Sequence, residues 1–337
     1  MPATNARVST LITKPLLYTP YDVKWVPSSA RFCVIGANAR GHGVIAVYEI
    51  DGKELQLTHE VEKPSSFKCG TFGASTLYTR HLATGNFAGD LQLWDLERTE
   101  IPILSIKAHG NIIHAIDGCG GASSPNGAPE LATASRDGTV KVWDLRQREK
   151  PVITVRSGSK DMVKTRDVWC VAFGNAHSDT ERALAAGYDN GDIKLFDLRT
   201  ISSMWETNTN SGICSLEFAK TDAPMSRLVA TTLDSFHIFD LTTLKSGPEV
   251  ESKTVKPSAD GTVWTVRHLL QDPTIFATTT GDGSVQLYRH DEGPLALSTL
   301  TVSPHPVTAF DWSPDKRGLC VFSAFDQNVR VGFVSGV

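Results

Sequence analysis

His109, Ser135 and Asp137 carry the three side chains of a hydrolytic triad, in which an imidazole takes the proton of a serine nucleophile. In the α/β-hydrolases that serine stands on a sharp turn between a strand and a helix, which exposes its oxygen. Here Ser135 ends the strand-like segment ELATAS (130–135) and leads into the polar turn RDGT (136–139). We therefore expect a structural role for these residues and predict no catalytic residue.

Two further segments have the residue types of a phosphate-binding or calcium-binding loop without the required spacing. The glycine-rich loop 117–130 lies between two predicted strands, whereas a phosphate-binding loop leads into a helix. The turn DNGD (189–192) lacks the terminal glutamate of a calcium loop. No two cysteines have the CxxC spacing of a zinc or redox site: Cys33, Cys69, Cys119, Cys170, Cys214 and Cys320. We predict no metal, no cofactor and no enzymatic activity.

An alternating apolar strand that ends in an aromatic residue and an acid recurs along the chain, most completely in ASRDGTVKVWDLR (134–146). The aromatic position of the seven copies holds Tyr48, Trp94, Trp143, Phe196, Phe239, Tyr288 and Gly332. Their spacing runs from 43 residues, between Phe196 and Phe239, to 53, between Trp143 and Phe196. A period of about 40–45 residues with a Trp-Asp pair is typical of WD repeats, and insertions lengthen some copies. We predict an all-β fold, a seven-bladed WD40 β-propeller that forms one domain over residues 1–337.

Each blade is expected to have four antiparallel strands, and almost no helix is expected. Inner strands are clearest at 168–174 and 263–269, and Asp/Asn-Gly turns join the second and third strands into hairpins. The last repeat supplies three strands, while the early segment VSTLITK (8–14) has no partner of its own. Because open sheet edges promote aggregation, we predict that this segment pairs with the last blade and closes the ring.

The repeat suggests a role for the triad-like residues. WD repeats often contain a buried chain of hydrogen bonds among Trp, Ser/Thr, His and Asp. The third repeat has one residue of each kind, and we predict that these form a structural relay: His109, Ser135, Asp137 and Trp143. A buried indole and a buried imidazole both need hydrogen-bond partners, which explains why such residues occur together.

The second letter of each aligned inner strand is expected to face the narrow end of the ring, near its axis. This position holds Tyr21, Lys68, His114, Trp169, Cys214, Trp264 and Thr308. The residues before the turn acids should face the same side: Arg136, Phe325, Tyr188 and Phe87. Aromatic and arginine side chains dominate binding hot spots. We predict a partner-binding site at Tyr21, Lys68, His114, Arg136, Trp169, Trp264 and Phe325. In the alternative interpretation, Trp169 and Trp264 only pack between blades.

The composition favours a soluble protein of the reducing cytosol. The net charge of −4 is too small and too negative to attract nucleic acid or anionic lipid over a distance. No apolar run approaches the ~18 residues that cross a bilayer, and the first residues lack the plan of a secretory signal. We expect a cytoplasmic location, with no nucleic acid and no membrane among its partners.

Long stretches of the chain resemble the Monad family of WD-repeat proteins, which are dynein axonemal assembly factors. The most specific are FKCGTFGA (67–74), LATGNFAGDLQLWDLE (82–97), IIHAIDG (112–118), APELATASRDGTVKVWDLRQ (128–147), VAFGNAHSDTERALAAGYDNGDIKLFDLR (171–199) and WSPDKRGLCVFSAFDQNVRV (312–331). The resemblance covers nearly the whole chain. It implies a cytoplasmic co-chaperone adaptor that works with the RuvB-like ATPase and prefoldin-like complex, with dynein heavy chains as clients and a link to apoptosis. The chain would then be a monomer within a larger complex.

Two other binding functions stay open. Aromatic residues around the ring axis could form a cage for methyl-lysine in a histone tail, although Lys68 and Arg136 disfavour a cationic ligand. The motif WDLR (143–146) matches the WDxR motif of propellers that serve as substrate receptors of ubiquitin ligases. Both alternatives, like the adaptor, are non-catalytic.

Overall fold

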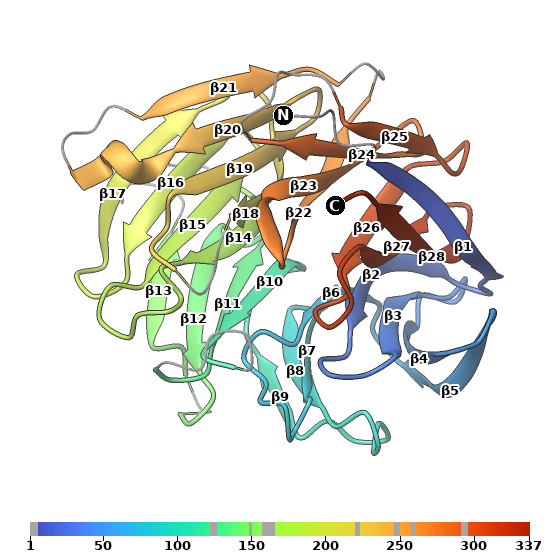
Figure 1. The fold of residues 1–337 in the computed structure, drawn as a ribbon. Helices are drawn as coiled ribbons and strands as arrows, with labels where there is room; N and C mark the ends of the chain where they lie inside the picture. The colour runs from blue at the N-terminus through green and yellow to red at the C-terminus, as the bar shows by residue number, and fades with distance from the viewer. Residues whose placement is uncertain are drawn as a thin grey trace.

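Seven four-stranded antiparallel sheets surround one axis in the computed structural model, each sheet forming a blade (Figure 1). The structure describes residues 6–121, 127–147, 150–156, 166–219, 223–245, 250–257, 261–290 and 296–337. Part of the predicted glycine-rich loop, residues 122–126, lies outside these ranges. The predicted seven-bladed β-propeller is confirmed.

The strands of the first three blades follow one another outward from the axis. Blade 1 comprises β2 (Thr19–Trp25), β3 (Arg31–Ala37), β4 (Gly43–Asp51) and β5 (Glu54–Lys63). Blade 2 comprises β6 (Phe67–Thr71), β7 (Leu82–Asn86), β8 (Asp90–Trp94) and β9 (Leu104–Lys107). Blade 3 comprises β10 (Ile113–Cys119), β11 (Glu130–Ser135), β12 (Thr139–Asp144) and β13 (Ile153–Arg156).

The next three blades repeat this order. Blade 4 comprises β14 (Val168–Gly174), β15 (Ala183–Tyr188), β16 (Asp192–Asp197) and β17 (Ser202–Asn208). Blade 5 comprises β18 (Ile213–Phe218), β19 (Arg227–Thr232), β20 (Phe236–Asp240) and β21 (Glu251–Val255). Blade 6 comprises β22 (Val263–Leu269), β23 (Asp272–Thr280), β24 (Ser284–Arg289) and β25 (Ser298–Thr301).

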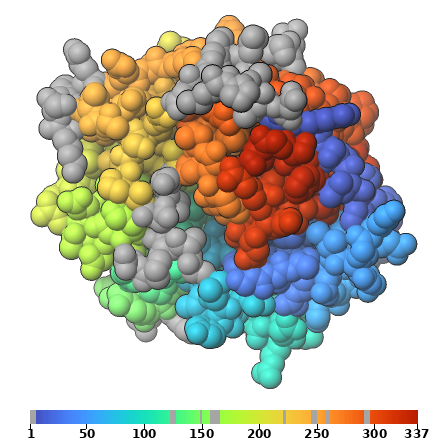
Figure 2. Space-filling view, viewed as in Figure 1, coloured from blue at the N-terminus to red at the C-terminus, as the bar shows by residue number. Residues whose placement is uncertain are grey.

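Blade 7 combines both ends of the chain and closes the ring. It comprises β26 (Val307–Trp312), β27 (Leu319–Ala324), β28 (Asn328–Ser335) and, outermost, β1 (Arg7–Pro15). The strand β1 runs antiparallel to β28, with Arg7 opposite Ser335 and Pro15 opposite Asn328, and lies beside it in Figure 1. In Figure 2 the blue N-terminal segment packs against the red last blade. The predicted closure by residues 8–14 is confirmed, and the strand is one residue longer at each end.

One short helix occurs among the described residues, the 3-10 helix η1 (Leu241–Lys245), so the expectation of almost no helix is confirmed. Within the described ranges, no helix is long and apolar enough to cross a membrane.

The hydrophobic core lies in layers between neighbouring blades. One layer joins Val23 and Phe32 of blade 1 to Val321 and Val331 of blade 7. Another joins blade 6 to blade 7 and includes Val8 of β1. Because each strand presents alternate side chains to its two faces, every sheet contributes to the layer on either side.

Acidic side chains link the inner strands of neighbouring blades. Each accepts a hydrogen bond from a backbone N–H of the next blade: Asp311 from Trp25 (2.8 Å), Asp22 from Gly70 (2.9 Å), Asp117 from Phe173 (2.8 Å) and Glu217 from His268. Burial raises the pKa of Asp311 to about 6, although Lys24 and Arg267 act in the opposite direction. These bonds fix the inner strands to each other at four of the seven junctions between blades, namely 7–1, 1–2, 3–4 and 5–6.

Every inner strand has a β-bulge near its start. In β14, for example, the pairing register shifts between Val168 and Cys170, so that Trp169 has no partner across the ladder. The same shift in all seven blades leaves one unpaired residue in each: Tyr21, Lys68, His114, Trp169, Cys214, Trp264 and Thr308. A bulge bends the strand locally and redirects the side chain of the extra residue. The fold therefore presents seven redirected side chains, one from each blade.

Candidate partner-binding site

The seven bulge residues, which we call the bulge ring, lie at one end of the propeller. The strand β6 begins at Phe67, which pairs with Asn86 at the end of β7. The bulges and the turns between second and third strands therefore share this end, which we call the bulge face. All seven residues of the ring are half-buried. They are the residues for which the sequence predicted a shared face.

Four aromatic side chains form a continuous arc on the bulge face. The ring of Trp264 lies 6.3 Å from that of Phe325, which lies 6.3 Å from that of Tyr21. The ring of Phe87 follows at 5.5 Å from Tyr21. These residues, the aromatic arc, come from blades 6, 7, 1 and 2, and Phe325 is 37% exposed in the turn between β27 and β28. Edge-on and tilted ring contacts of this kind stabilise a preformed apolar surface.

Three basic side chains, the basic group, continue the ring beyond the arc. The ammonium of Lys68 lies 5.0 Å from the centre of the Tyr21 ring, within the range of a cation–π interaction. Burial, together with the charges of Lys68 and Arg136, lowers the pKa of His114 to about 4, so the imidazole is neutral at pH 7. Arg136 lies in the turn between β11 and β12 and forms an ion pair of 3.5 Å with Asp167.

Several polar atoms of the bulge ring have no partner among the described residues. They are Nε2 of His114, Nε1 of Trp264 and Oγ1 of Thr308, and all three are buried. Buried polar atoms are nearly always hydrogen-bonded in folded proteins. At these three bulge positions, hydrogen-bonding capacity is therefore left unused by the described residues.

Two other predicted face residues, Trp169 and Tyr188, do not join the arc or the basic group. The Trp169 ring packs over Gly212, where a Cβ atom would come 2.7 Å from the ring, so Trp169 fills the junction of blades 4 and 5. The prediction for Tyr188 is wrong, because this side chain is buried in the core between blades. Tyr188 ends β15 and pairs with Val168, so the turn position equivalent to Arg136 is held by Asp189.

The predicted relay needs one correction. The Thr133 hydroxyl lies 3.0 Å from the Trp143 indole nitrogen and 2.7 Å from Nε2 of His109, whose Nδ1 lies 3.1 Å from Asp137. Ser135 does not join this chain, since its hydroxyl donates to the backbone carbonyl of Asn111 and accepts the N–H of Asp137. Burial lowers the pKa of His109 to about 4, although Asp137 opposes the shift. The neutral imidazole of His109 links the Thr133 hydroxyl to the Asp137 carboxylate and so has a structural role. Ser135 is not part of this chain of hydrogen bonds.

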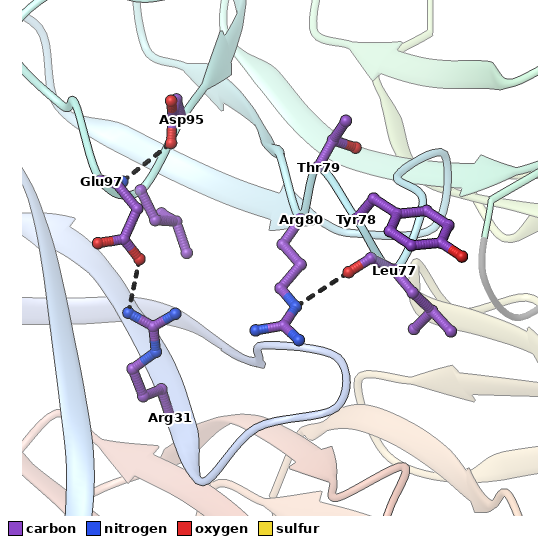
Figure 3. A pocket seen from close by; sticks show the side chains of 8 residues that line it. Arg31, Leu77, Tyr78, Thr79, Arg80, Asp95 and Glu97 are labelled. Atoms are coloured by element: carbon purple, nitrogen blue, oxygen red, sulfur yellow. Dashed lines mark hydrogen bonds and ion pairs between the residues drawn. The ribbon is translucent and has the colours of Figure 1, made fainter.

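The opposite face of the propeller has its own hollow, of about 370 Å³, between blades 1 and 2 (Figure 3). Its walls carry the ion pair of Arg31 with Glu97 (2.8 Å) and Arg80, whose Nε donates to the Leu77 carbonyl. Tyr78 stands beside it with 98% of its side chain exposed. No residue of the bulge ring lines this hollow.

Across the described residues, no group of three or more His, Cys, Asp and Glu side chains is arranged to hold a metal ion.

The fold and its repeats define a WD-repeat β-propeller, and the family described as "WD domain, G-beta repeat" matches residues 100–144. The chain is 49% identical to dynein axonemal assembly factor 10 of Bos taurus, over 96% of this chain and 95% of the relative. It is 46% identical to the protein of that name in Chlamydomonas reinhardtii, over the same shares, and 26% identical to that of Dictyostelium discoideum, over 94% and 92%. The chain belongs to the dynein axonemal assembly factor 10 family, which confirms the resemblance seen in the sequence.

Proposed function

We propose that this protein is a non-catalytic scaffold for the assembly of axonemal dyneins and that it binds a protein partner on its bulge face. The names of the relatives support the process, and the fold supports the role of a binding platform. The observation that carries the site is that seven bulges bring one unpaired residue from each blade to one face.

The aromatic arc supplies the affinity in this proposal. Tryptophan, tyrosine and phenylalanine bury large apolar areas at little entropic cost, and truncating a central one typically costs about 2 kcal/mol or more of binding free energy. The arc is held rigid by its own ring contacts and by the acidic links between inner strands. A partner therefore meets a surface that needs little reorganisation.

The finer role follows from the family resemblance. A scaffold of this kind would act in the cytoplasm as a co-chaperone adaptor, bound to the RuvB-like ATPase and prefoldin-like complex, with dynein heavy chains as clients. The link to apoptosis rests on the same resemblance alone.

The alternative functions gain less support from the geometry. A methyl-lysine needs a free aromatic ring face, and the ammonium of Lys68 already lies over the Tyr21 ring. In the WDLR motif Trp143 and Asp144 are buried at the end of β12, and Arg146 forms an ion pair with Asp144 at 2.7 Å. These side chains are therefore engaged within the blade.

Complementation tests the proposed function. A Chlamydomonas reinhardtii strain lacking its own relative is given this chain, and dynein heavy chains in isolated axonemes are quantified by mass spectrometry. The wild-type chain and the Tyr78→Ala control, on the opposite face, are expected to restore the heavy chains. The double variant Trp264→Ala, Phe325→Ala is expected not to restore them, although it folds. Full restoration by the double variant would rule out the bulge face as the working surface.

A further inference from the structure

Lys68 is a half-buried cation without a carboxylate partner. Among the described residues it forms no ion pair. The carboxylate of Asp22, whose charge favours the charged form of Lys68, already accepts from Lys24 at 2.8 Å and from the Gly70 N–H. Burial disfavours the charged form and lowers the pKa of Lys68. A cation in this environment gains free energy when an anion approaches it.

Two further basic side chains, His114 and Arg136, stand on the same side of the ring. Nε2 of His114 is buried without a partner, and His114 is near enough to Lys68 and Arg136 for their charges to affect it. Arg136 has 57% of its side chain exposed and holds Asp167 through Nε only, at 3.5 Å. A guanidinium has five N–H donors, so most of them stay available to a ligand.

We propose that the basic group, Lys68, His114 and Arg136, binds the carboxylate of an acidic protein segment, whose neighbouring apolar side chain packs on the aromatic arc. This inference rests on the proposed function, because it assigns the chemistry of the partner at the same face. The contact of Lys68 with Tyr21 joins the two halves, so that one short segment can reach both.

The acids of blade 4 limit where the carboxylate binds. Asp167 already pairs with Arg136, and Asp189 lies in the adjoining turn, where burial and the charge of Asp167 raise its pKa. An anion is therefore repelled from the blade 4 side and drawn towards Lys68 in blade 2. We expect Lys68 to matter more than Arg136.

An acidic protein segment suits this site better than a nucleic acid. The chain has a net charge of −4, and nucleic-acid sites depend on many basic contacts with phosphates. The basic group has only three side chains, and it adjoins an apolar arc that an aliphatic or aromatic side chain can cover.

Fluorescence anisotropy with three labelled dodecapeptides tests the inference. The peptides share a central Leu-Phe-Leu and carry Glu, Gln or Lys at the other positions. The Glu peptide is expected to bind the full-length protein about tenfold more tightly than the Gln peptide, and the Lys peptide more weakly than both. In Lys68→Gln the preference for Glu over Gln should nearly vanish, and in Arg136→Gln it should fall several-fold.

Matched variants keep the test decisive. Arg80→Gln removes a cation from the opposite face and is expected to leave the preference unchanged. Arg136→Gln changes an exposed side chain and so preserves the fold even if Lys68→Gln does not. Tighter binding of the Lys or Gln peptide, a preference that survives both variants, or no binding of any peptide at about 1 mM would overturn the inference. A single-stranded oligonucleotide that outcompetes the Glu peptide would overturn it too. None of these results changes the complementation outcome, which decides the proposed function separately.

Discussion

The hydroxyl of Thr133 bonds two buried nitrogen atoms, one on Trp143 and one on His109. Replacing Thr133 by Val keeps the shape and removes both bonds. A buried donor or acceptor left without a partner costs about 1–3 kcal/mol, so we expect the free energy of unfolding to fall by about 2–4 kcal/mol. Chemical denaturation followed by tryptophan fluorescence measures the change.

Thr278 provides the matched control for this variant. It occupies the equivalent position in blade 6, and both threonines are 0% exposed, but the Thr278 hydroxyl has no hydrogen-bond partner among the described residues. Thr278→Val should therefore leave the stability unchanged or raise it slightly. Equal losses in the two variants would mean that the relay contributes nothing.

The sequence indicated the kinds of residue in the relay but not the hydroxyl that completes it. Trp143 pairs with Leu131 across the ladder, which makes Thr133 its diagonal neighbour and puts Ser135 one step further away. Thr133 and Ser135 lie two residues apart on the same face of β11, so the alternating pattern alone treats them alike. Only the pairing register separates them.

The buried histidines predict how stability depends on pH. Burial lowers the pKa values of His109 and His114 to about 4 and that of His290 to about 3, below the ordinary 6.5. As the pH falls below 6.5, these imidazoles become protonated in the unfolded chain but stay neutral in the folded protein. The free energy of unfolding should therefore decrease from pH 6.5 towards 4. The pKa of His237 is lowered as well, so four imidazoles act in this direction. The raised pKa values of Asp117, Asp189 and Asp311 oppose the effect, but the imidazoles outnumber these carboxyls.

NMR titration of the histidine ring resonances checks the cause, and denaturation at several pH values checks the effect. The His109 ring should remain neutral in the folded protein until about pH 4. A His109 that titrates near 6.5, or a stability that rises on acidification over this window, would contradict the prediction.

At the scale of elements, β1 joins the two ends of the chain. Its Val8 is buried in the layer between blades 6 and 7, and its backbone completes the edge of β28. Deleting residues 1–14 would expose that edge and open the layer, so we expect the melting temperature to drop steeply and aggregation to increase. Deleting residues 1–5, which leaves β1 whole, is the control. A melting curve unchanged by the longer deletion would refute the closure as a source of stability.

The sequence predicted the inner and second strands better than the outer ones. Inner strands such as β14 and β22 have apolar alternation over seven residues and match the predicted ranges residue for residue. Outer strands such as β13 and β25 have four residues each and alternate between half-buried and exposed, which leaves too little apolar contrast to recognise. The seventh aromatic position is Gly332 because a Cβ there would come 2.8 Å from the Phe322 ring.

The bulges were the feature of the site that the sequence did not reveal. The aligned strands placed the bulge residues on one face. A bulge has no sequence pattern of its own, however, because the seven bulge residues differ widely in type, from a tryptophan at Trp169 to a threonine at Thr308. Their redirection depends on pairing between strands, which a single strand does not encode. The contacts that split the ring into an arc and a basic group likewise join residues from different blades.

In the whole molecule, the two faces of the propeller differ in the side chains that they present. The bulge face holds a preformed aromatic and basic surface. On the opposite face, the exposed Tyr78 lies beside the hollow that contains the ion pair of Arg31 with Glu97. Removing Trp264 and Phe325 together takes two of the four rings from the arc and leaves the layers between blades intact. We expect the double variant to keep the melting temperature within a few degrees of the wild type while it loses its partner.

Affinity purification from cells with motile cilia, quantified by mass spectrometry, tests whether the bulge face binds the partner. The wild type, Trp264→Ala with Phe325→Ala, and Tyr78→Ala are compared at equal expression. We expect the wild type and Tyr78→Ala to recover the same dynein-assembly proteins, RuvB-like ATPases among them, and the double variant to lose them at least tenfold. Undiminished recovery by the double variant, or a loss confined to Tyr78→Ala, would contradict the assignment of the bulge face as the partner-binding surface.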